Sequence, residues 1–136
     1  MRLLQQPWRV FGLLTLGGVT CLQNAFALCV DGRHPGLAAE TAASSAVVIG
    51  RVDQASDYTT ADDPAGIAGT TYTITVLQVK KGHPPKTLHI QSENTSSRFP
   101  MSTGRRYLLF ITGGPENGVI DACGNSHALD ERVIAD

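Results

Sequence analysis

The stretch TYTITVLQV, residues 71–79, places the strongest constraint on how this chain can fold. Tyr72 and Ile74 alternate with threonines, which is the pattern of a strand with one buried face. At Leu77 the phase slips, and Leu77 and Val79 continue the apolar series in the other register. A slip inside a long strand indicates a bulge or a sharp bend. A strand of this kind can serve both sides of a small closed barrel.

Four further segments read as strands, and polar segments separate them. Residues 107–111, YLLFI, are apolar at every position, which is typical of a strand buried on both faces. Residues 53–70 and 92–104 are polar and rich in turn-forming residues, so they are predicted as loops, the second with Phe99 as an anchor. The four predicted strands are 46–52, 88–91, 107–111 and 119–120.

Little of the chain favours a helix. The segment His34-Pro35-Gly36 introduces a short helical stretch from Leu37 to about Ala43, and the tail from Ala128 is expected to form a short helix or to fray. Five strands with so little helix predict an all-β fold, a five-stranded Greek-key barrel of the OB type with one or two short helices. An immunoglobulin-like sandwich is the alternative, but it has about seven strands and a core tryptophan.

The first 27 residues have the three parts of a secretory signal peptide. Arg2 and Arg9 give a positive start, and residues 10–22 form an uncharged apolar run. Ala25-Phe26-Ala27 then supplies the A-x-A pattern of a cleavage site. The apolar run is too short to cross a bilayer, which needs about 20 residues. A buried N-terminal helix is the alternative.

Cleavage is expected after Ala27, with the position after Leu28 left open. It leaves residues 28–136 as a single exported domain, either periplasmic or extracellular. No small residue stands directly before Cys21 or Cys29, so neither fits a lipid-attachment site and no membrane anchor is expected.

The cysteine count agrees with export. The chain has three cysteines, and removal of the leader takes Cys21 with it. The two that remain in an exported domain indicate one disulfide, Cys29–Cys123. It would close a loop of nearly the whole domain, for which the chain-entropy model gives about 4–5 kcal/mol. Two free buried thiols are the alternative.

The charge of the chain excludes one class of partner. Of the 11 basic side chains, Arg2 and Arg9 belong to the leader, so the remaining domain has a formal charge of −3 with its 12 acidic side chains. Nucleic-acid binding rests on clustered basic groups that neutralise phosphates. The densest basic pairs, Lys80-Lys81 and Arg105-Arg106, read instead as solvated strand ends and turns. We expect no nucleic-acid partner and a monomeric domain.

No constellation of catalytic or metal-binding residues stands out. The four histidines show neither helical ligand spacing nor a Cys/His cluster. They are His34, His83, His89 and His127. Asp57, Asp62 and Asp63 share a loop but lack the alternation and closing glutamate of a calcium loop. No serine or threonine lies in a nucleophile elbow. We therefore expect no enzymatic activity, no metal and no cofactor.

Several short motifs, taken together, resemble a known group of domains. They are Cys29, AVVIGRV (46–52), TYTITVLQVKKG (71–82), PKTLHI (85–90), GRRYLLF (104–110) and CGNS (123–126). From about residue 29 to residue 127, the chain resembles the N-terminal domain of tissue inhibitors of metalloproteinases (TIMP) and the related netrin-like domains, as found in small exported bacterial proteins. The resemblance implies an OB-type barrel.

The resemblance also implies a function. In that family, the α-amino group and carbonyl oxygen of an N-terminal cysteine chelate the zinc of the target protease, and the next side chain enters the substrate pocket. By position, these roles would fall to Cys29 and Val30. Cleavage after Ala27 leaves Leu28 ahead of Cys29, however, so the Cys29 nitrogen would be an amide without a lone pair for a metal. Asp31 stands where the family has a second cysteine.

We therefore interpret the chain as an exported small β-barrel module that binds a partner and has no catalysis of its own. The partner is expected to be a protein, with a metalloprotease as one candidate. The alternative function is inhibition of a metalloprotease through the N-terminal cysteine segment. The expected contact surface comprises Cys29, Val30 and Asp31 with the adjoining loop around Tyr58, because the corresponding regions form one contiguous edge in the related inhibitors.

Overall fold

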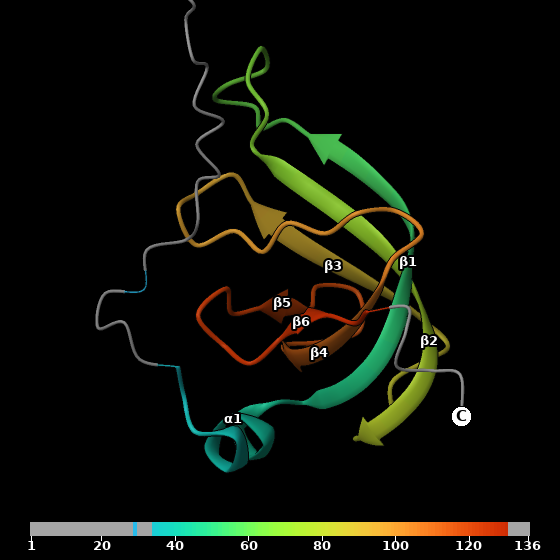
Figure 1. Cartoon of the computed structure of the whole chain (residues 1–136). Helices are drawn as coiled ribbons and strands as arrows, with labels where there is room; N and C mark the ends of the chain where they lie inside the picture. Colours follow the sequence, from blue (N-terminus) through green and yellow to red (C-terminus); the bar gives the residue numbers. More distant parts are fainter. Residues whose placement is uncertain (1–28, 30–33, 131–136) are drawn as a thin grey trace, which may run out of the picture.

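The computed structural model describes Cys29 and residues 34–130 (Figure 1). Its elements are α1 (Leu37–Ala43), β1 (Ala46–Tyr58), β2 (Gly69–Lys81), β3 (Thr87–Glu93), β4 (Arg106–Thr112), β5 (Val119–Ile120) and β6 (His127–Ala128). The expected leader, Leu28, Val30 and Asp31 lie outside the described residues. The predicted mostly β architecture is confirmed, and α1 occupies the residues predicted for it.

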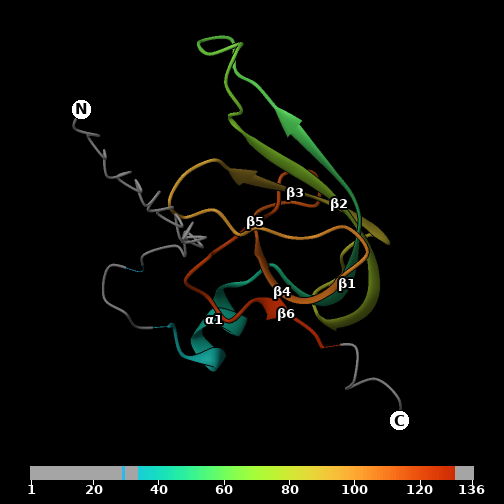
Figure 2. The ribbon, with the colours of Figure 1, turned by 45° about the horizontal axis from the view of Figure 1, so that its top comes forward.

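All the described strands belong to one sheet. Their order is β3-β2-β1-β4-β5, with β6 paired to β4, and each of these pairs is antiparallel. The immunoglobulin-like alternative requires two packed sheets instead. Figures 1 and 2 show β1 and β2 as a long curved hairpin, with its loop at one end of the molecule and α1 at the other.

The two outer edges of this strand order meet at one point. Ile90 of β3 forms an isolated parallel bridge with Gly118, which precedes β5. His89 and Gln91 of β3 donate backbone hydrogen bonds of 3.1 Å to Pro115 O and Gly118 O, respectively. Gly118 N donates in return to His89 O at 3.3 Å. Within the described residues no continuous ladder joins β3 to β5, so closure of the sheet into a barrel stays a prediction.

The phase slip predicted at Leu77 is present as an irregularity in β2. In the ladder between β1 and β2, Ile49 pairs with Gln78, and the next residue, Gly50, pairs with Val76. Leu77 of β2 therefore has no partner on β1. The side chains that follow the slip are mostly exposed, whereas buried side chains alternate before it. An extra residue of this kind bends a strand and increases its twist, which agrees with the curvature of β2 in Figure 1.

The loop predicted over residues 53–70 is wrong for its first part. β1 continues six residues beyond the predicted strand end, so the connection to β2 covers only residues 59–68. Residues 53–57 are exposed, and they show no alternation of apolar and polar side chains. Residues 54–57 are strand residues because their backbone pairs with β2, and Asp53 is the extra residue at a register shift between Val52 and Gln54. The strand propensity of a residue depends strongly on its neighbours in the sheet. Here pairing with β2 outweighs the weak strand propensity of the residues themselves.

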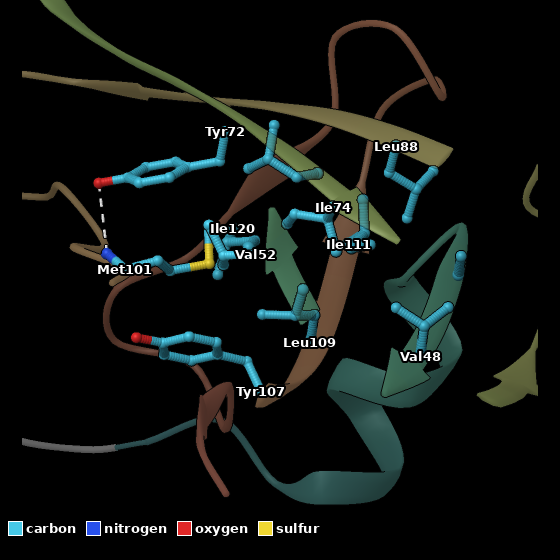
Figure 3. Packing of buried hydrophobic residues seen from close by; sticks show 12 residues of the cluster. Val48, Val52, Tyr72, Ile74, Leu88, Met101, Tyr107, Leu109, Ile111 and Ile120 are labelled. Carbon is cyan, nitrogen blue, oxygen red and sulfur yellow. Dashed lines mark hydrogen bonds between the residues drawn. The ribbon is translucent and has the colours of Figure 1, made fainter. Parts of the chain in front are cut away.

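The core is formed by alternate residues of the four long strands (Figure 3). Val48, Val52, Ile74 and Leu109 have no exposed surface. Full burial of one such side chain stabilises the fold by about 1.5–3 kcal/mol. The other buried members of the cluster are Ala46, Tyr72, Leu88, Ile90, Met101, Tyr107, Ile111 and Ile120.

β4 is buried on both faces, as its sequence predicts. On one face, Tyr107, Leu109 and Ile111 belong to the core cluster. Phe110 is also buried, but it lies outside that cluster. Phe110 pairs across the sheet with Val47 of β1, which is also buried outside the cluster. Ala39 and Ala43 of α1 line the same hollow as Phe110. α1 therefore covers the second face of β4.

The loop between β3 and β4 is fixed to the core by Met101, which is 8% exposed (Figure 3). Met101 N donates to Tyr72 Oη at 3.2 Å, and Ser102 N donates to Tyr107 Oη at 2.8 Å. Phe99 packs against the core cluster, and its ring meets the Tyr107 ring edge-on with centroids 6.2 Å apart. The predicted anchor at Phe99 is thus confirmed, and Met101 is a second anchor that the sequence analysis missed.

The C-terminal part differs from its prediction. Ala128 lies in β6, which pairs with Tyr107 and Leu108 of β4, and not in a helix or a frayed end. Leu129 N then donates to Arg106 O at 2.8 Å, which continues the contact with β4. A strand of two residues has too little pattern to be recognised from the sequence, and residues 131–136 lie outside the described part of the chain.

Candidate functional site

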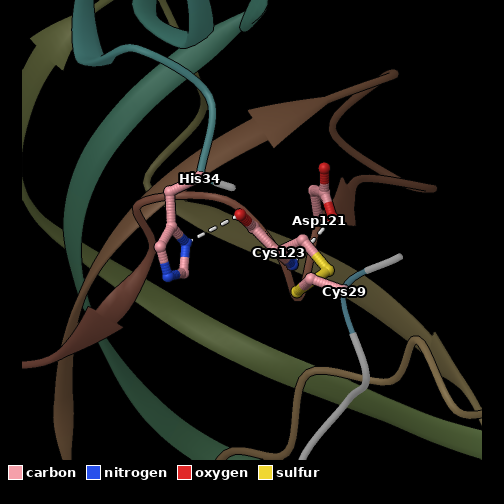
Figure 4. The surroundings of a disulfide bond; sticks show 4 residues. All are labelled: Cys29, His34, Asp121 and Cys123. Carbon is pink, nitrogen blue, oxygen red and sulfur yellow. Dashed lines mark hydrogen bonds between the residues drawn. A yellow bond between two sulfur atoms is a disulfide. The ribbon is translucent and has the colours of Figure 1, made fainter. Parts of the chain in front are cut away.

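A disulfide joins Cys29 to Cys123, which is the pairing predicted from the sequence. The two Cα atoms are 5.6 Å apart at a sequence separation of 94. Cys123 lies in the segment of residues 121–126 between β5 and β6, here named the cysteine loop (Figure 4). The bond therefore attaches the start of the described chain to a loop near its end.

The backbone of Cys123 makes two further hydrogen bonds (Figure 4). Cys123 N donates to Asp121 Oδ1 at 2.8 Å, and Cys123 O accepts from His34 Nδ1 at 2.9 Å. Because a carbonyl can only accept, the second contact requires a proton on His34 Nδ1. His34 precedes α1, so this bond links the N-terminal segment to the cysteine loop independently of the sulfur atoms.

The cysteine loop is also attached to α1 through Glu40. Glu40 Oε2 accepts from Asn125 N at 2.8 Å and from Asn125 Nδ2 at 2.5 Å. Asn125 Nδ2 also donates to Pro35 O at 2.9 Å. Hydrogen bonds to a carboxylate are stronger than those between neutral groups. The sequence analysis missed this pair, because one glutamate in a short helix reads as a solvent-exposed residue.

The remaining residues of the CGNS motif have structural roles as well. Gly124 lies so close to Glu40 that an added Cβ would collide with the carboxylate. Ser126 Oγ accepts from Phe110 N at 2.9 Å, and both residues are buried. The motif therefore holds the cysteine loop on α1 and on β4, in addition to supplying the disulfide.

Lys81, at the end of β2, binds the C-terminal end of α1. Its Nζ donates to the carbonyl oxygens of Thr41 at 2.5 Å, Ala42 at 3.0 Å and Ser44 at 2.7 Å. The last carbonyls of a helix lack partners within the helix, and a cation there also complements the helix dipole. The sequence predicts Lys81 as a solvated strand end, whereas its ammonium group is bonded to the helix.

Tyr58 ends β1, beside the β1–β2 loop, and is partly buried. It pairs with Gly69, where an added Cβ would lie 2.6 Å from Tyr58 Oη, so glycine makes room for the ring. Tyr58 O accepts from Ala68 N at 2.8 Å. These contacts hold Tyr58 on the β1–β2 hairpin, whereas the disulfide holds Cys29 on the cysteine loop. The two predicted contact residues are thus carried by different parts of the fold.

The aspartates near the β1–β2 loop make local contacts. Asp63 Oδ1 accepts from Gly66 N at 2.9 Å, three residues further along the same loop. Asp57 Oδ1 accepts from Thr70 Oγ1 at 2.8 Å across the hairpin. Among Cys29 and residues 34–130, no three His, Cys, Asp or Glu side chains are grouped so that they could hold a metal ion.

Asp53 has two partners on the outer surface of the sheet. Thr75 Oγ1 donates to Asp53 Oδ2, and Arg51 Nε donates to Asp53 Oδ1 at 2.9 Å as part of an ion pair. The hydrogen bond from Thr75, and then that from Arg51, lower the pKa of Asp53 below its usual value of 3.8. An exposed pair of this kind contributes little to stability.

Comparison with the models of known protein families and with curated proteins found no match. In the part of the chain that the structure describes, no helix is long and apolar enough to cross a membrane. The geometry of the chain itself is therefore the basis for a functional proposal. Its most distinctive feature is an N-terminal segment attached at several points to the cysteine loop.

Proposed function

We propose that the chain is an exported module, residues 28–136 after removal of its leader, that binds a protein partner and carries out no catalysis. The observation that carries the proposal is the attachment of the N-terminal segment to the cysteine loop. Cys29 is held there by the disulfide, and His34 and Glu40 are held by hydrogen bonds. Disulfides form and persist in oxidising compartments outside the cytoplasm. Residues held in this way, as Cys29, His34 and Glu40 are, lose little conformational freedom when they bind, which favours affinity.

The proposed contact surface comprises Cys29, Val30 and Asp31 together with the hairpin end at Tyr58. At the hairpin end, this proposal is supported by an apolar side chain that is exposed to solvent. Ile67, in the loop next to Tyr58, is 55% exposed. Tyrosine is among the residue types that contribute most to protein–protein binding, and Ile67 adds exposed apolar surface beside it.

The barrel belongs to the same proposal. We propose that the described strands form an OB-type Greek-key barrel, closed between β3 and β5. The parallel bridge between Ile90 and Gly118, with its two backbone hydrogen bonds, supports this closure, as does the nearby bond from His89 N to Pro115 O. In amide hydrogen exchange, Gln91 and Gly118 should then exchange as slowly as amides within the β1–β4 pair. Exchange of both amides at the rate of exposed loops would contradict closure.

A capture experiment tests the binding function. The mature domain is immobilised and exposed to the exported proteins of its own host, with and without a chelator, and captured proteins are purified and rebound. We expect one partner that binds in both conditions and is weakened by Tyr58→Ala. Asp62→Ala, in the same loop region but without a described side-chain bond, should leave binding unchanged. No reproducible partner, or binding indifferent to Tyr58, would contradict the proposal.

Inhibition of a metalloprotease is the second candidate. The observation in its favour is that the disulfide fixes Cys29, which the inhibitor resemblance assigns to zinc. This mechanism needs Cys29 as the first residue, with a free amine. N-terminal sequencing and the intact mass of the exported protein, measured without reductant, decide the matter, because they report the cleavage site and the disulfide together. Leu28 as the first residue rules the mechanism out.

A further inference from the structure

A hollow of about 410 Å³ lies between β3 and β5, beyond the point where the two strands meet. We name it the seam hollow. One edge is the end of β3, with Gln91 and Glu93, and the other is β5, with Val119 and Ile120. Asp121, the first residue of the cysteine loop, also lines it. The seam hollow therefore lies next to the loop that carries the Cys29–Cys123 bond.

Backbone pairing between the two edges stops where the hollow begins. Gly118 exchanges hydrogen bonds with His89 and Gln91, and within the described residues no further bridge follows. Alternate residues of a strand direct their N–H and C=O groups to the same side. Ile120 therefore directs both groups toward the hollow, and Glu93 directs its N–H there from β3. Such groups form an open strand edge, which can pair with another extended segment.

The side chains around the hollow determine which segment fits. Glu93 and Asp121 bring one carboxylate from each edge, and neither forms an ion pair within the described part of the chain. Arg98 lines the hollow from the β3–β4 loop, but its Nη1 donates to Asn94 Oδ1 at 3.1 Å. Val119 is 51% exposed and adds apolar surface. The hollow thus combines open backbone groups, one aliphatic side chain, and the carboxylates of Glu93 and Asp121 against the single guanidinium of Arg98, although Asp121 Oδ1 also accepts from Cys123 N.

We propose that the seam hollow binds an extended segment of the partner protein that carries a lysine or an arginine. The backbone of that segment pairs with the open groups of Glu93 and Ile120, as in recognition by strand addition. Its basic side chain meets the carboxylates of Glu93 and Asp121, and an aliphatic side chain covers Val119. This inference rests on the proposed function, because it specifies which part of a protein partner is recognised and where.

A displayed library of random heptapeptides, selected on the mature domain, tests the inference. The enriched peptides should combine β-branched residues with at least one lysine or arginine. Glu93→Lys should weaken the binding of the synthesised peptides by at least about tenfold, because it places like charges together. Asp130→Lys makes the same change of charge on an exposed residue that lies outside the seam hollow and the β1–β2 loop and has no described side-chain bond, and it should change binding by less than about twofold.

Amide hydrogen exchange of the complex gives a second measurement. A peptide paired in the seam should slow exchange at Glu93 and Ile120, while exchange at the core residue Leu109 shows that each variant is folded. The inference is overturned if no peptide is enriched, if binding survives Glu93→Lys, or if Glu93 and Ile120 gain no protection.

The captured partner separates this inference from the proposed function. If the partner binds the Glu93→Lys variant at full strength but is lost on Tyr58→Ala, the binding function stands and the seam assignment is wrong. If the partner is lost with Glu93→Lys and kept with Asp130→Lys, the seam assignment is supported. If no partner is captured by the unchanged domain, the proposed function itself fails.

Discussion

The two ends of the β1–β2 hairpin are held by different kinds of contact. At the end near α1, residues 46–51 of β1 pair with β4 as well as with β2, and several of their side chains are buried. At the other end, residues 53–58 are almost entirely exposed, and of these residues 54–58 pair with β2. We name these the anchored end and the hairpin tip, which Figures 1 and 2 show at opposite ends of the molecule.

The difference between the two ends shows that a segment can have strand geometry without contributing much to the stability of the fold. Backbone pairing and exposed side-chain hydrogen bonds such as that of Asp57 with Thr70 hold the hairpin tip, whereas the anchored end adds burial, the Lys81 contact with α1 and the disulfide-bound cysteine loop. Regions with few buried apolar contacts open at low free energy. The hairpin tip should therefore open locally without unfolding of the core, and changes at the anchored end should cost more. The following predictions test that difference.

Removal of the disulfide should have the largest effect. Replacing Cys29 and Cys123 together by serine should lower the free energy of unfolding by about 4 kcal/mol, because the unfolded chain regains the freedom of a long loop. Denaturant unfolding of the variant, compared with reduced wild-type protein as a control, measures this loss. A loss below about 1 kcal/mol would mean that the hydrogen bonds of His34 and Glu40 hold the N-terminal segment without the sulfur bond.

A cavity in the core should come next. Leu109→Ala removes a fully buried side chain and should cost about 3 kcal/mol. Ser56→Ala, an exposed change at the hairpin tip, should cost no more than about 0.5 kcal/mol. Denaturant midpoints of both variants provide the measurement. Comparable losses would show that the tip is coupled to the core as tightly as the anchored end is.

Loss of one buried acceptor should have a smaller effect. Ser126→Ala leaves the buried Phe110 N–H without its partner and should cost about 1–2 kcal/mol. Thr70→Ala is the matched control, because it also removes a hydroxyl bond, to Asp57, but at the exposed hairpin tip. That control should cost less than about 0.5 kcal/mol. Thermal unfolding of the two variants compares them, and the reverse order would argue against the anchored end as the stable one.

The smallest effect is a pH dependence of stability that arises from Asp53, at the start of the exposed part of β1. The pKa of Asp53 is lowered in the folded state, so folding favours its ionised form. Its stabilising effect is then present above the usual aspartate pKa and is lost as the pH falls through the lower folded value. Wild type should be slightly more stable than Asp53→Asn at neutral pH and equal to it in acid. Asp62→Asn should show no such difference, and an advantage that persists in acid would contradict the prediction.

Much of the fold could be predicted because its long strands leave a repeated pattern of apolar residues in the sequence. The alternation before Leu77 and the apolar run of 107–111 each extend over several residues, and both were read correctly. The exposed strand residues 53–57 carry no such repeat, because pairing with β2 gives them their conformation. Met101 was missed for a similar reason, since two tyrosine hydroxyls far from it in the sequence hold its loop in place.

The candidate site was predictable only where covalent chemistry limits the choices. The expected removal of the leader with Cys21 leaves two cysteines and one internal pairing, so Cys29–Cys123 followed from counting. The contact between Glu40 and Asn125 joins residues 85 positions apart and is made by single side chains, which leave no periodic signal. The seam hollow likewise arises from where two strands stop pairing, a property of the assembled sheet.

The Cys29–Cys123 bond has a consequence for how the protein is made. A precursor that keeps Cys21 has three cysteines and therefore three possible intramolecular pairings, two of them incorrect. If the leader is removed as proposed, Cys21 leaves with it, and any internal oxidation of the remaining domain gives the native bond. The proposed processing therefore predicts a domain that matures with an electron acceptor alone, with no wrong bond for a disulfide isomerase to repair.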